Sequence, residues 1–192
     1  MGDAPRRLVV GISGASGIIY GVRLLAALRD LGIETHLVMS IPAEVTLQQE
    51  MDLATADVTR LASHVYSADN LAAPIASGSF RTEGMMVVPC SMKTLSAVAN
   101  SYAENLLARA ADVALKEGRP LLLAVRETPL HVGHLRLMTR AAEIGAIIFP
   151  PVPAFYARPQ TVDAMVDQTV GRMLARMGIT DKLHTPWEGP RS

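Results

Sequence analysis

Short, mostly apolar segments alternate with longer amphipathic segments along almost the whole chain. Strands that are apolar throughout, rather than alternately apolar and polar, are typical of a parallel sheet covered on both faces. Because such strands here alternate with helices, the pattern predicts an α/β fold with a single doubly wound, mostly parallel sheet and helices on both faces. The predicted strands are Leu8–Ile12, Glu34–Met39, Met85–Val88, Leu121–Val125 and Ala146–Phe149.

Between these strands, apolar residues recur at helical spacing. The predicted helices are Ile18–Arg29, Ala43–Glu50, Thr55–Val65, Leu130–Ile144 and Thr161–Met177, with a further helical region that opens at Pro89–Thr94 and continues through Asn105–Glu117. Ser67–Ser79 lacks periodicity and is predicted to be a loop. A length of 192 residues fits one domain, 1–192, in which residues from about 179 to 192 form an irregular tail.

Composition removes several classes of function. Eighteen basic residues balance eighteen acidic ones, so no net field favours nucleic acid or an anionic membrane as a partner. No apolar run approaches the roughly 20 residues of a membrane span, and the N-terminus does not resemble a signal peptide. A single cysteine, Cys90, forms no internal disulfide, which favours a cytoplasmic location. Apolar content of 49% with ten methionines favours a homo-oligomer, which would bury further surface.

Ligands of open parallel sheets bind beyond the carboxyl ends of the strands. The segment Gly11–Gly17 follows the first strand and brings backbone N–H groups to a helix start, where an anion or a flavin edge can bind. It is not the G-x-G-x-x-G fingerprint of dinucleotide sites, and Ser40 stands where an acidic residue is expected after the second strand. A nicotinamide dinucleotide is therefore disfavoured. The alternative is a tight turn that needs glycine only for steric reasons.

Other strand ends carry further candidate residues. Ser91 and Thr94 begin a helix, where their hydroxyls can bind a phosphate or simply cap the helix. Cys90 is a candidate nucleophile, but a lone buried cysteine is usually inert. Charged Arg126 and Glu127 directly follow a buried strand, either to serve a ligand or an interface, or as a surface ion pair.

Near the C-terminus, a proline-rich segment and two histidines complete the candidates. Pro150–Pro159 is too rich in proline for a helix, and predicts a stiff loop that presents Tyr156 or packs it into the core. His131 and His134 lie three residues apart without a third ligand nearby, so the sequence predicts no metal site.

Six segments in order resemble the UbiX-type flavin prenyltransferases. They are Ser13–Gly17, Ala76–Ser79, Pro89–Ser96, Asn105–Glu117, Arg126–Pro129 and Pro153–Pro159, and together the resemblance covers nearly the whole chain. It implies a flavodoxin-like fold, assembly as a dodecamer, and transfer of a dimethylallyl group from dimethylallyl phosphate to N5 and C6 of reduced FMN. The product, prenylated FMN, would pass to a partner decarboxylase of the UbiD type. The absence of an Asp-rich motif agrees with a metal-independent reaction of a monophosphate.

The resemblance also implies roles for individual residues. Ser16 and Glu50 match proton-relay residues, and Trp187 matches a tryptophan on a mobile tail that covers the site. An aromatic residue of some family members is replaced near Leu71. The flavin would contact Gly14, Ala15, Ser16, Ser40, Ser91, Met92, Lys93, Thr94 and Arg126. The prenyl phosphate would be held by Tyr156 and Arg172, with Lys116, Arg126 and Glu127 contributing near a subunit interface.

Two other functions stay open at this stage. One is a non-catalytic subunit that binds and delivers flavin to an aromatic acid decarboxylase. The other is a flavin-dependent cysteine decarboxylase on a related fold. Members of that class carry a Pro-x-Met-Asn segment, whereas this chain has Pro89-Cys90-Ser91-Met92 without the asparagine.

Overall fold

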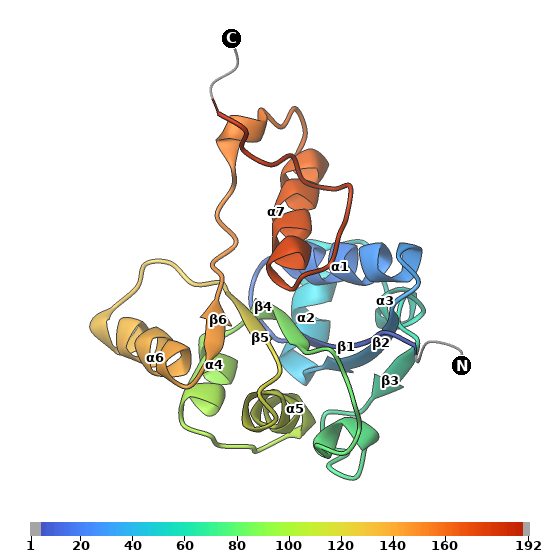
Figure 1. Cartoon of the computed structure of the whole chain (residues 1–192), viewed down its shortest axis with the longest axis vertical. Coiled ribbons are helices and arrows are strands. Elements are labelled where there is room, and N and C mark those ends of the chain that lie inside the picture. Colours follow the sequence, from blue (N-terminus) through green and yellow to red (C-terminus); the bar gives the residue numbers. More distant parts are fainter. Residues whose placement is uncertain (1–4, 190–192) are drawn as a thin grey trace.

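The computed structural model describes residues 5–189, which form one six-stranded parallel sheet with strand order β3-β2-β1-β4-β5-β6 (Figure 1). Every neighbouring pair of strands is parallel. From the centre, the chain builds outward through β2 and β3 on one side of β1, and then through β5 and β6 beyond β4. The predicted α/β fold with a doubly wound sheet is confirmed. The strands are β1 (Arg7–Ile12), β2 (Glu34–Met39), β3 (His64–Tyr66), β4 (Met85–Cys90), β5 (Leu121–Val125) and β6 (Ala146–Ile148).

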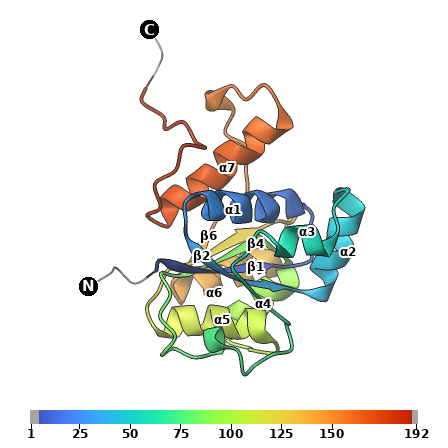
Figure 2. The same cartoon turned by 90° about the vertical axis from the view of Figure 1, so that its right-hand side faces the viewer.

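Helices cover both faces of the sheet (Figure 2). One face carries α1 (Ile18–Asp30), α2 (Ile41–Glu50), α3 (Thr55–Thr59) and α7 (Val162–Arg176). The other face carries α4 (Met92–Ala99), α5 (Leu106–Lys116) and α6 (Val132–Glu143). Within the described part of the chain, none of these helices has the length and apolarity needed to cross a membrane.

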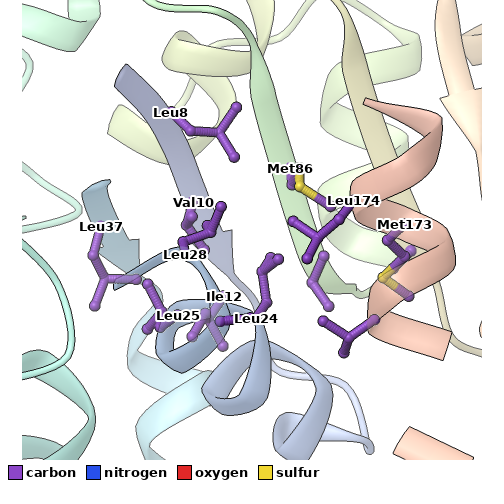
Figure 3. Close-up of a cluster of buried hydrophobic side chains, with 14 of the residues drawn as sticks. Leu8, Val10, Ile12, Leu24, Leu25, Leu28, Leu37, Met86, Met173 and Leu174 are labelled. Carbon is purple, nitrogen blue, oxygen red and sulfur yellow. The ribbon is translucent and has the colours of Figure 1, made fainter. Parts of the chain in front are cut away.

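Two hydrophobic clusters, one on each face, explain why the strands are apolar throughout. Val10 and Ile12 of β1 point toward α1 and α7, where they lie among Leu24, Leu28 and Leu174 (Figure 3). Their neighbour Val9 belongs to the opposite cluster with α4 and α5. Each fully buried aliphatic side chain contributes about 1.5–3 kcal/mol, so both layers are held firmly on the sheet.

The strand β3 corrects the prediction that Thr55–Val65 is one helix. The helix ends at Thr59, and His64–Tyr66 pairs with β2 instead. Reciprocal hydrogen bonds explain this placement: the Thr35 N–H donates to Ser63 Oγ at 3.1 Å, and the Ser63 N–H donates to Thr35 Oγ1 at 3.0 Å. The β-branched Val65 and aromatic Tyr66 also favour a strand.

A second break divides the predicted helical region after β4. Ser101 adopts a positive φ of 52°, which an α-helix does not accommodate, and α4 has ended by then. Asn105 starts α5 by accepting a hydrogen bond from the Ala108 N–H at 2.9 Å. The region therefore forms two helices rather than one.

After α7 the chain returns along the same helix as an extended segment. Between Gly178 and Gly189 it forms neither helix nor strand, and the rest of the predicted tail, residues 190–192, lies outside the described residues. The Gln168 side chain fastens this segment to α7, because its Nε2 donates to the Thr185 carbonyl at 3.0 Å and its Oε1 accepts from the Thr185 N–H at 2.7 Å. Gly171 permits the approach, since a Cβ there would lie 2.7 Å from the backbone N of His184.

Candidate functional site

The two central strands define where a ligand can bind. Beyond β1 the chain turns toward one edge of the sheet and beyond β4 toward the other, which opens a crevice at their carboxyl ends. The buried Ser13 joins the two turns: its hydroxyl donates to the Pro89 carbonyl at 3.0 Å and accepts from the Ser91 N–H at 2.8 Å. Ser13 was predicted as part of the turn after the first strand, but its link to the second turn could not be predicted, because its partners lie 76 and 78 positions away.

A cavity of about 450 Å³ lies at this crevice. Its volume falls within the roughly 300–1,000 Å³ that small-molecule sites occupy. The cavity collects residues from the turns after β1, β2, β4 and β5 and from the starts of α4 and α5. Seven of the predicted site residues line it: Gly14, Ser40, Ser91, Met92, Lys93, Thr94 and Glu127. Polar residues that the sequence analysis did not single out also line it, namely Asp69, Glu104 and Asn105.

The start of α4 forms one wall of the cavity. Ser91 caps the helix, since its Oγ accepts from the Thr94 N–H at 3.3 Å and donates to Thr94 Oγ1 at 3.1 Å. Within residues 5–189, the backbone N–H groups of Met92 and Lys93 have no hydrogen-bond acceptor. The positive end of a helix dipole and free N–H groups together favour an anion at this point. Capping and anion binding are therefore compatible here.

The start of α1 is closed by a carboxylate of the chain itself. Glu50, the last residue of α2, accepts hydrogen bonds at Oε2 from the N–H groups of Gly17 at 2.8 Å and Ile18 at 3.0 Å. Gly17 takes a positive φ of 98°, which glycine adopts without strain. The N–H groups of Gly17 and Ile18 at the helix start after β1 are therefore already engaged.

Glu50 also sits in a field that keeps it ionised. Partial burial raises the pKa of Glu50, but the Ser16 side chain, the Gly17 and Ile18 N–H groups and the charge of Arg126 together outweigh burial and lower it. Burial likewise raises the pKa of Tyr20, and Arg126 opposes this shift. The structure thus places Ser16, Glu50 and Arg126 near one another beside the α1 start.

Arg126 and Glu127 do not form an ion pair with each other among the described residues. The Arg126 side chain is exposed, and its backbone N–H donates to the Cys90 carbonyl at 3.1 Å. Glu127 faces the cavity and accepts from the Thr128 N–H at 3.0 Å. The surface-pair interpretation of these two residues is not supported.

Tyr156 and Trp187 contact each other beside α7, and Arg172 lies on α7 itself. Tyr156 belongs to a short 3₁₀ turn, Phe155–Ala157, and its ring meets Trp187 edge-on with centroids 5.6 Å apart. Its hydroxyl accepts from Gln168 Nε2 at 3.4 Å. Arg172 lines a separate hollow of about 180 Å³ between β6 and α7, and Tyr156 does not line it. The proline-rich segment therefore presents Tyr156 at the surface rather than in the core.

Three other candidates lie apart from the cavity. Lys116 pairs with Glu117 at the end of α5, which precedes β5 and so lies at the amino-terminal edge of the sheet, away from Arg126. Leu71 is 52% exposed and does not line the cavity. Complete burial raises the pKa of the Cys90 thiol to about 12, so Cys90 is a poor nucleophile at neutral pH.

Comparison with known proteins agrees with this geometry. The sequence model of the Flavoprotein family matches residues 2–183. The flavin prenyltransferase UbiX of Escherichia coli K12 is 60% identical over 187 residues, covering 96% of this chain and 99% of the relative. UbiX of Thauera aromatica is 55% identical over 183 residues, covering 95% of this chain and 94% of the relative.

Solved structures show the same likeness. The crystal structure of AnUbiX (PadA1) in complex with FMN and dimethylallyl pyrophosphate superposes with a TM-score of 0.96 at 47% identity, covering 98% of this chain and all of that one. A dodecameric FMN-dependent UbiX-like decarboxylase from Escherichia coli O157:H7 superposes with a TM-score of 0.93 at 47% identity, covering 95% of this chain and all of that one. The fold is thus the flavodoxin-like fold of these proteins, and the chain belongs to the flavoprotein family of UbiX-type flavin prenyltransferases.

Proposed function

We propose that this chain transfers a dimethylallyl group from dimethylallyl phosphate to N5 and C6 of reduced FMN, yielding prenylated FMN. The observation that carries this proposal is the 450 Å³ cavity at the β1/β4 crevice, with the open start of α4 in its wall. Relatives at 55–60% identity over nearly the full length bear the name flavin prenyltransferase.

The residues of the cavity suit FMN. Free N–H groups at Met92 and Lys93, with the hydroxyls of Ser91 and Thr94, provide donors for a phosphate. Gly14 lets the turn after β1 pack directly against Pro42, since a Cβ at Gly14 would overlap that ring. Ser40 lines the cavity beside Gly14, and Ala15 and Ser16 follow in the same turn as Gly14. When bound, the reduced flavin supplies the nucleophilic nitrogen, and the protein supplies position and electrostatics.

The prenyl donor needs cations around its phosphate. An allylic phosphate ionises readily when preorganised positive groups stabilise the departing anion, without need of a metal. Arg126 follows β5 at the carboxyl end of the sheet and Arg172 lies on α7; both side chains are exposed, and Tyr156 adds a hydroxyl. Trp187 covers Tyr156 in this conformation, so its tail segment would shield the donor from water.

Ser16 and Glu50 would manage the proton released when the new ring closes. The carboxylate of Glu50 is ionised near neutral pH and can accept a proton, as a weak base because its pKa is lowered. Ser16 adjoins it and can relay that proton from a ligand in the cavity.

A shared site would explain the position of Lys116. Within one chain Lys116 lies at the opposite edge of the sheet from Arg126 and Glu127. It can therefore contribute only to the cavity of a neighbouring copy. A homo-oligomer, which we propose to be a dodecamer as in the relative from Escherichia coli O157:H7, meets this need. We further propose a cytoplasmic location and a UbiD-type decarboxylase as the receiver of the product.

Mass spectrometry of the flavin after anaerobic incubation with reduced FMN and dimethylallyl phosphate tests the proposal. We expect FMN to gain the mass of one dimethylallyl-derived unit in an enzyme-dependent manner. Bound but chemically unchanged FMN would instead favour the flavin-delivery subunit. Decarboxylation of a C-terminal cysteine peptide without prenylated product would favour the cysteine decarboxylase.

A further inference from the structure

A second cluster of chemically active side chains lies at the far edge of the sheet, away from the cavity. The pairing of β2 with β3 sets His36 directly opposite His64. Glu34 precedes His36 by two positions, so all three side chains emerge from the same face of the sheet. His36 is 2% exposed, whereas His64 reaches solvent.

The Glu34 carboxylate lies about as far from each imidazole nitrogen as two ligands of one tetrahedral metal ion lie from each other. Glu34 Oε1 lies 3.0 Å from His36 Nε2 and 3.4 Å from His64 Nε2, and the three ligand atoms all lie within 4.8 Å of one another. Ligand atoms about 2.0–2.1 Å from a tetrahedral zinc ion are roughly 3.3 Å apart. Two imidazoles and one carboxylate are a donor set that zinc uses when it keeps its fourth position open.

We propose that Glu34, His36 and His64 form a binding site for a divalent transition metal of the zinc class, with water as the fourth ligand. An outer partner already orients His36, because its Nδ1 lies 2.9 Å from the Tyr66 hydroxyl. In the metal-free protein the Nε2–H of His36 donates to Glu34 Oε1 at 3.0 Å and Nδ1 accepts from the Tyr66 hydroxyl, so metal binding displaces the Nε2 proton and turns Nδ1 into the donor to Tyr66. The rings of His36 and His64 stack with centroids 4.7 Å apart and planes at 17°, so the exposed His64 ring must rotate for both Nε2 lone pairs to meet at one ion.

One side chain competes with the metal. Arg7 Nε donates to Glu34 Oε1, the proposed ligand atom, at 3.1 Å. Its guanidinium also lies 5.1 Å from the centroid of the Phe80 ring. A cation at this position opposes a second cation by Coulomb repulsion, so metal binding requires that Arg7 move away from Oε1. The Arg7 side chain is one-third exposed and has room to do so.

The site is independent of the proposed prenyl transfer, since no residue of the cluster lines the 450 Å³ cavity. It also differs from the His131 and His134 pair, whose rings lie 3.6 Å apart but for which residues 5–189 offer no third ligand. A metal site at Glu34, His36 and His64 therefore predicts that substitution of His64 weakens metal binding and that substitution of His131 does not.

Calorimetric titration of the tag-free full chain with Zn²⁺ tests the proposal, with Co²⁺ absorption as a second readout of tetrahedral coordination. We expect one ion per chain. His64→Gln should weaken binding by more than the roughly 10- to 100-fold that loss of an outer partner costs, and Tyr66→Phe by about 10-fold. Arg7→Gln should tighten binding, because it removes the competing cation.

His131→Gln is the matched control and should leave Zn²⁺ affinity unchanged. FMN affinity, measured for each variant, reports whether the variant is folded, because the cluster lies away from the cavity. The proposal is overturned if the chain binds no Zn²⁺, if His64→Gln binds as tightly as the original chain while folded, or if His131→Gln abolishes binding.

Discussion

The starts of α1 and α4 lie side by side at the same crevice. Two N–H groups at the α1 start are hydrogen-bonded to a carboxylate, whereas two at the α4 start have no acceptor among residues 5–189. Both follow a central strand and both open with small or hydroxyl-bearing residues. At α1, Glu50 accepts the N–H groups of Gly17 and Ile18. At α4, the Ser91 side chain caps only the Thr94 N–H, and the N–H groups of Met92 and Lys93, two residues that line the cavity, have no acceptor in residues 5–189.

The difference shows that a glycine-rich turn does not by itself make an anion site. The α1 turn is richer in glycine, but a carboxylate 33 positions further along the chain fills it. The α4 start contains no glycine, and its N–H groups at Met92 and Lys93 have no acceptor within residues 5–189. Whether a helix start can bind a ligand therefore depends on whether a neighbouring element already supplies an acceptor for its N–H groups.

Closing the α4 start should have the largest effect. Replacing both Ser91 and Thr94 by leucine fills the cavity wall and removes two hydroxyls, so the Kd for FMN should rise about 100-fold or more, measured by flavin fluorescence. Thr161→Ala is the control, because Thr161 caps α7 in the same way, accepting from the Ala164 N–H at 3.0 Å, but lies outside the cavity. Equal FMN affinity in the double variant and the control would remove the α4 start from the site.

Arg172 should affect the prenyl donor rather than the flavin. A charge-assisted hydrogen bond contributes roughly 1.5–3 kcal/mol, so Arg172→Ala should raise the apparent KM for dimethylallyl phosphate by about 10- to 100-fold with FMN affinity intact. Tyr156→Phe should have a smaller effect, since the ring remains. Arg176→Ala, one helical turn further along α7, is the control. Donor kinetics unaffected by Arg172→Ala would assign that residue to a solvated helix face.

Removing the charge of Glu50 at the α1 start should slow catalysis and slightly lower the free energy of unfolding. Glu50→Gln keeps the shape of the cap but loses its charge and its ability to accept a proton, so turnover should fall while FMN still binds. Because Glu50 is exposed, we expect the free energy of unfolding to fall by only about 0.5–1 kcal/mol. Glu44→Gln on the same helix is the control and should change neither quantity. Full turnover of Glu50→Gln at every pH would contradict a role in proton transfer.

The same residue predicts a small pH dependence of stability. A carboxyl whose pKa is lowered in the folded state stabilises the protein above its unfolded pKa, and this contribution is lost as pH falls through the lower folded pKa. Unfolding of the original chain and of Glu50→Gln should therefore converge in the acidic range and separate toward neutral pH. Denaturant titrations at several pH values measure this separation, and parallel stability curves would count against it.

Much of the fold could be predicted from the sequence because its signals are local. The strands are apolar on both faces, so β1, β2, β4, β5 and β6 were predicted within a few residues. The exception, β3, is three residues long and is held by the Thr35 and Ser63 hydrogen bonds, which join segments 28 positions apart. Misreading it as helix also concealed that His36 and His64 are neighbours.

In the candidate site too, local features could be predicted from the sequence and contacts between distant segments could not. Ser91 to Thr94 belong to one short segment, and the pattern of hydroxyls after a strand pointed to them directly. The contacts of Glu50 with Gly17 and of Ser13 with Ser91 depend on how distant segments pack, which no spacing reveals. The location of Lys116 depends on packing between copies and stays a prediction.

We propose that the phosphate of the flavin binds at the α4 start and not at the α1 start. The most direct measurement is the ratio of affinities for FMN and riboflavin, which differ only in the phosphate. We expect the preference for FMN to fall at least several-fold when Ser91 and Thr94 are both replaced by alanine, and to stay unchanged in Glu50→Gln. A preference that survives the alanine substitutions but changes in Glu50→Gln would contradict the assignment.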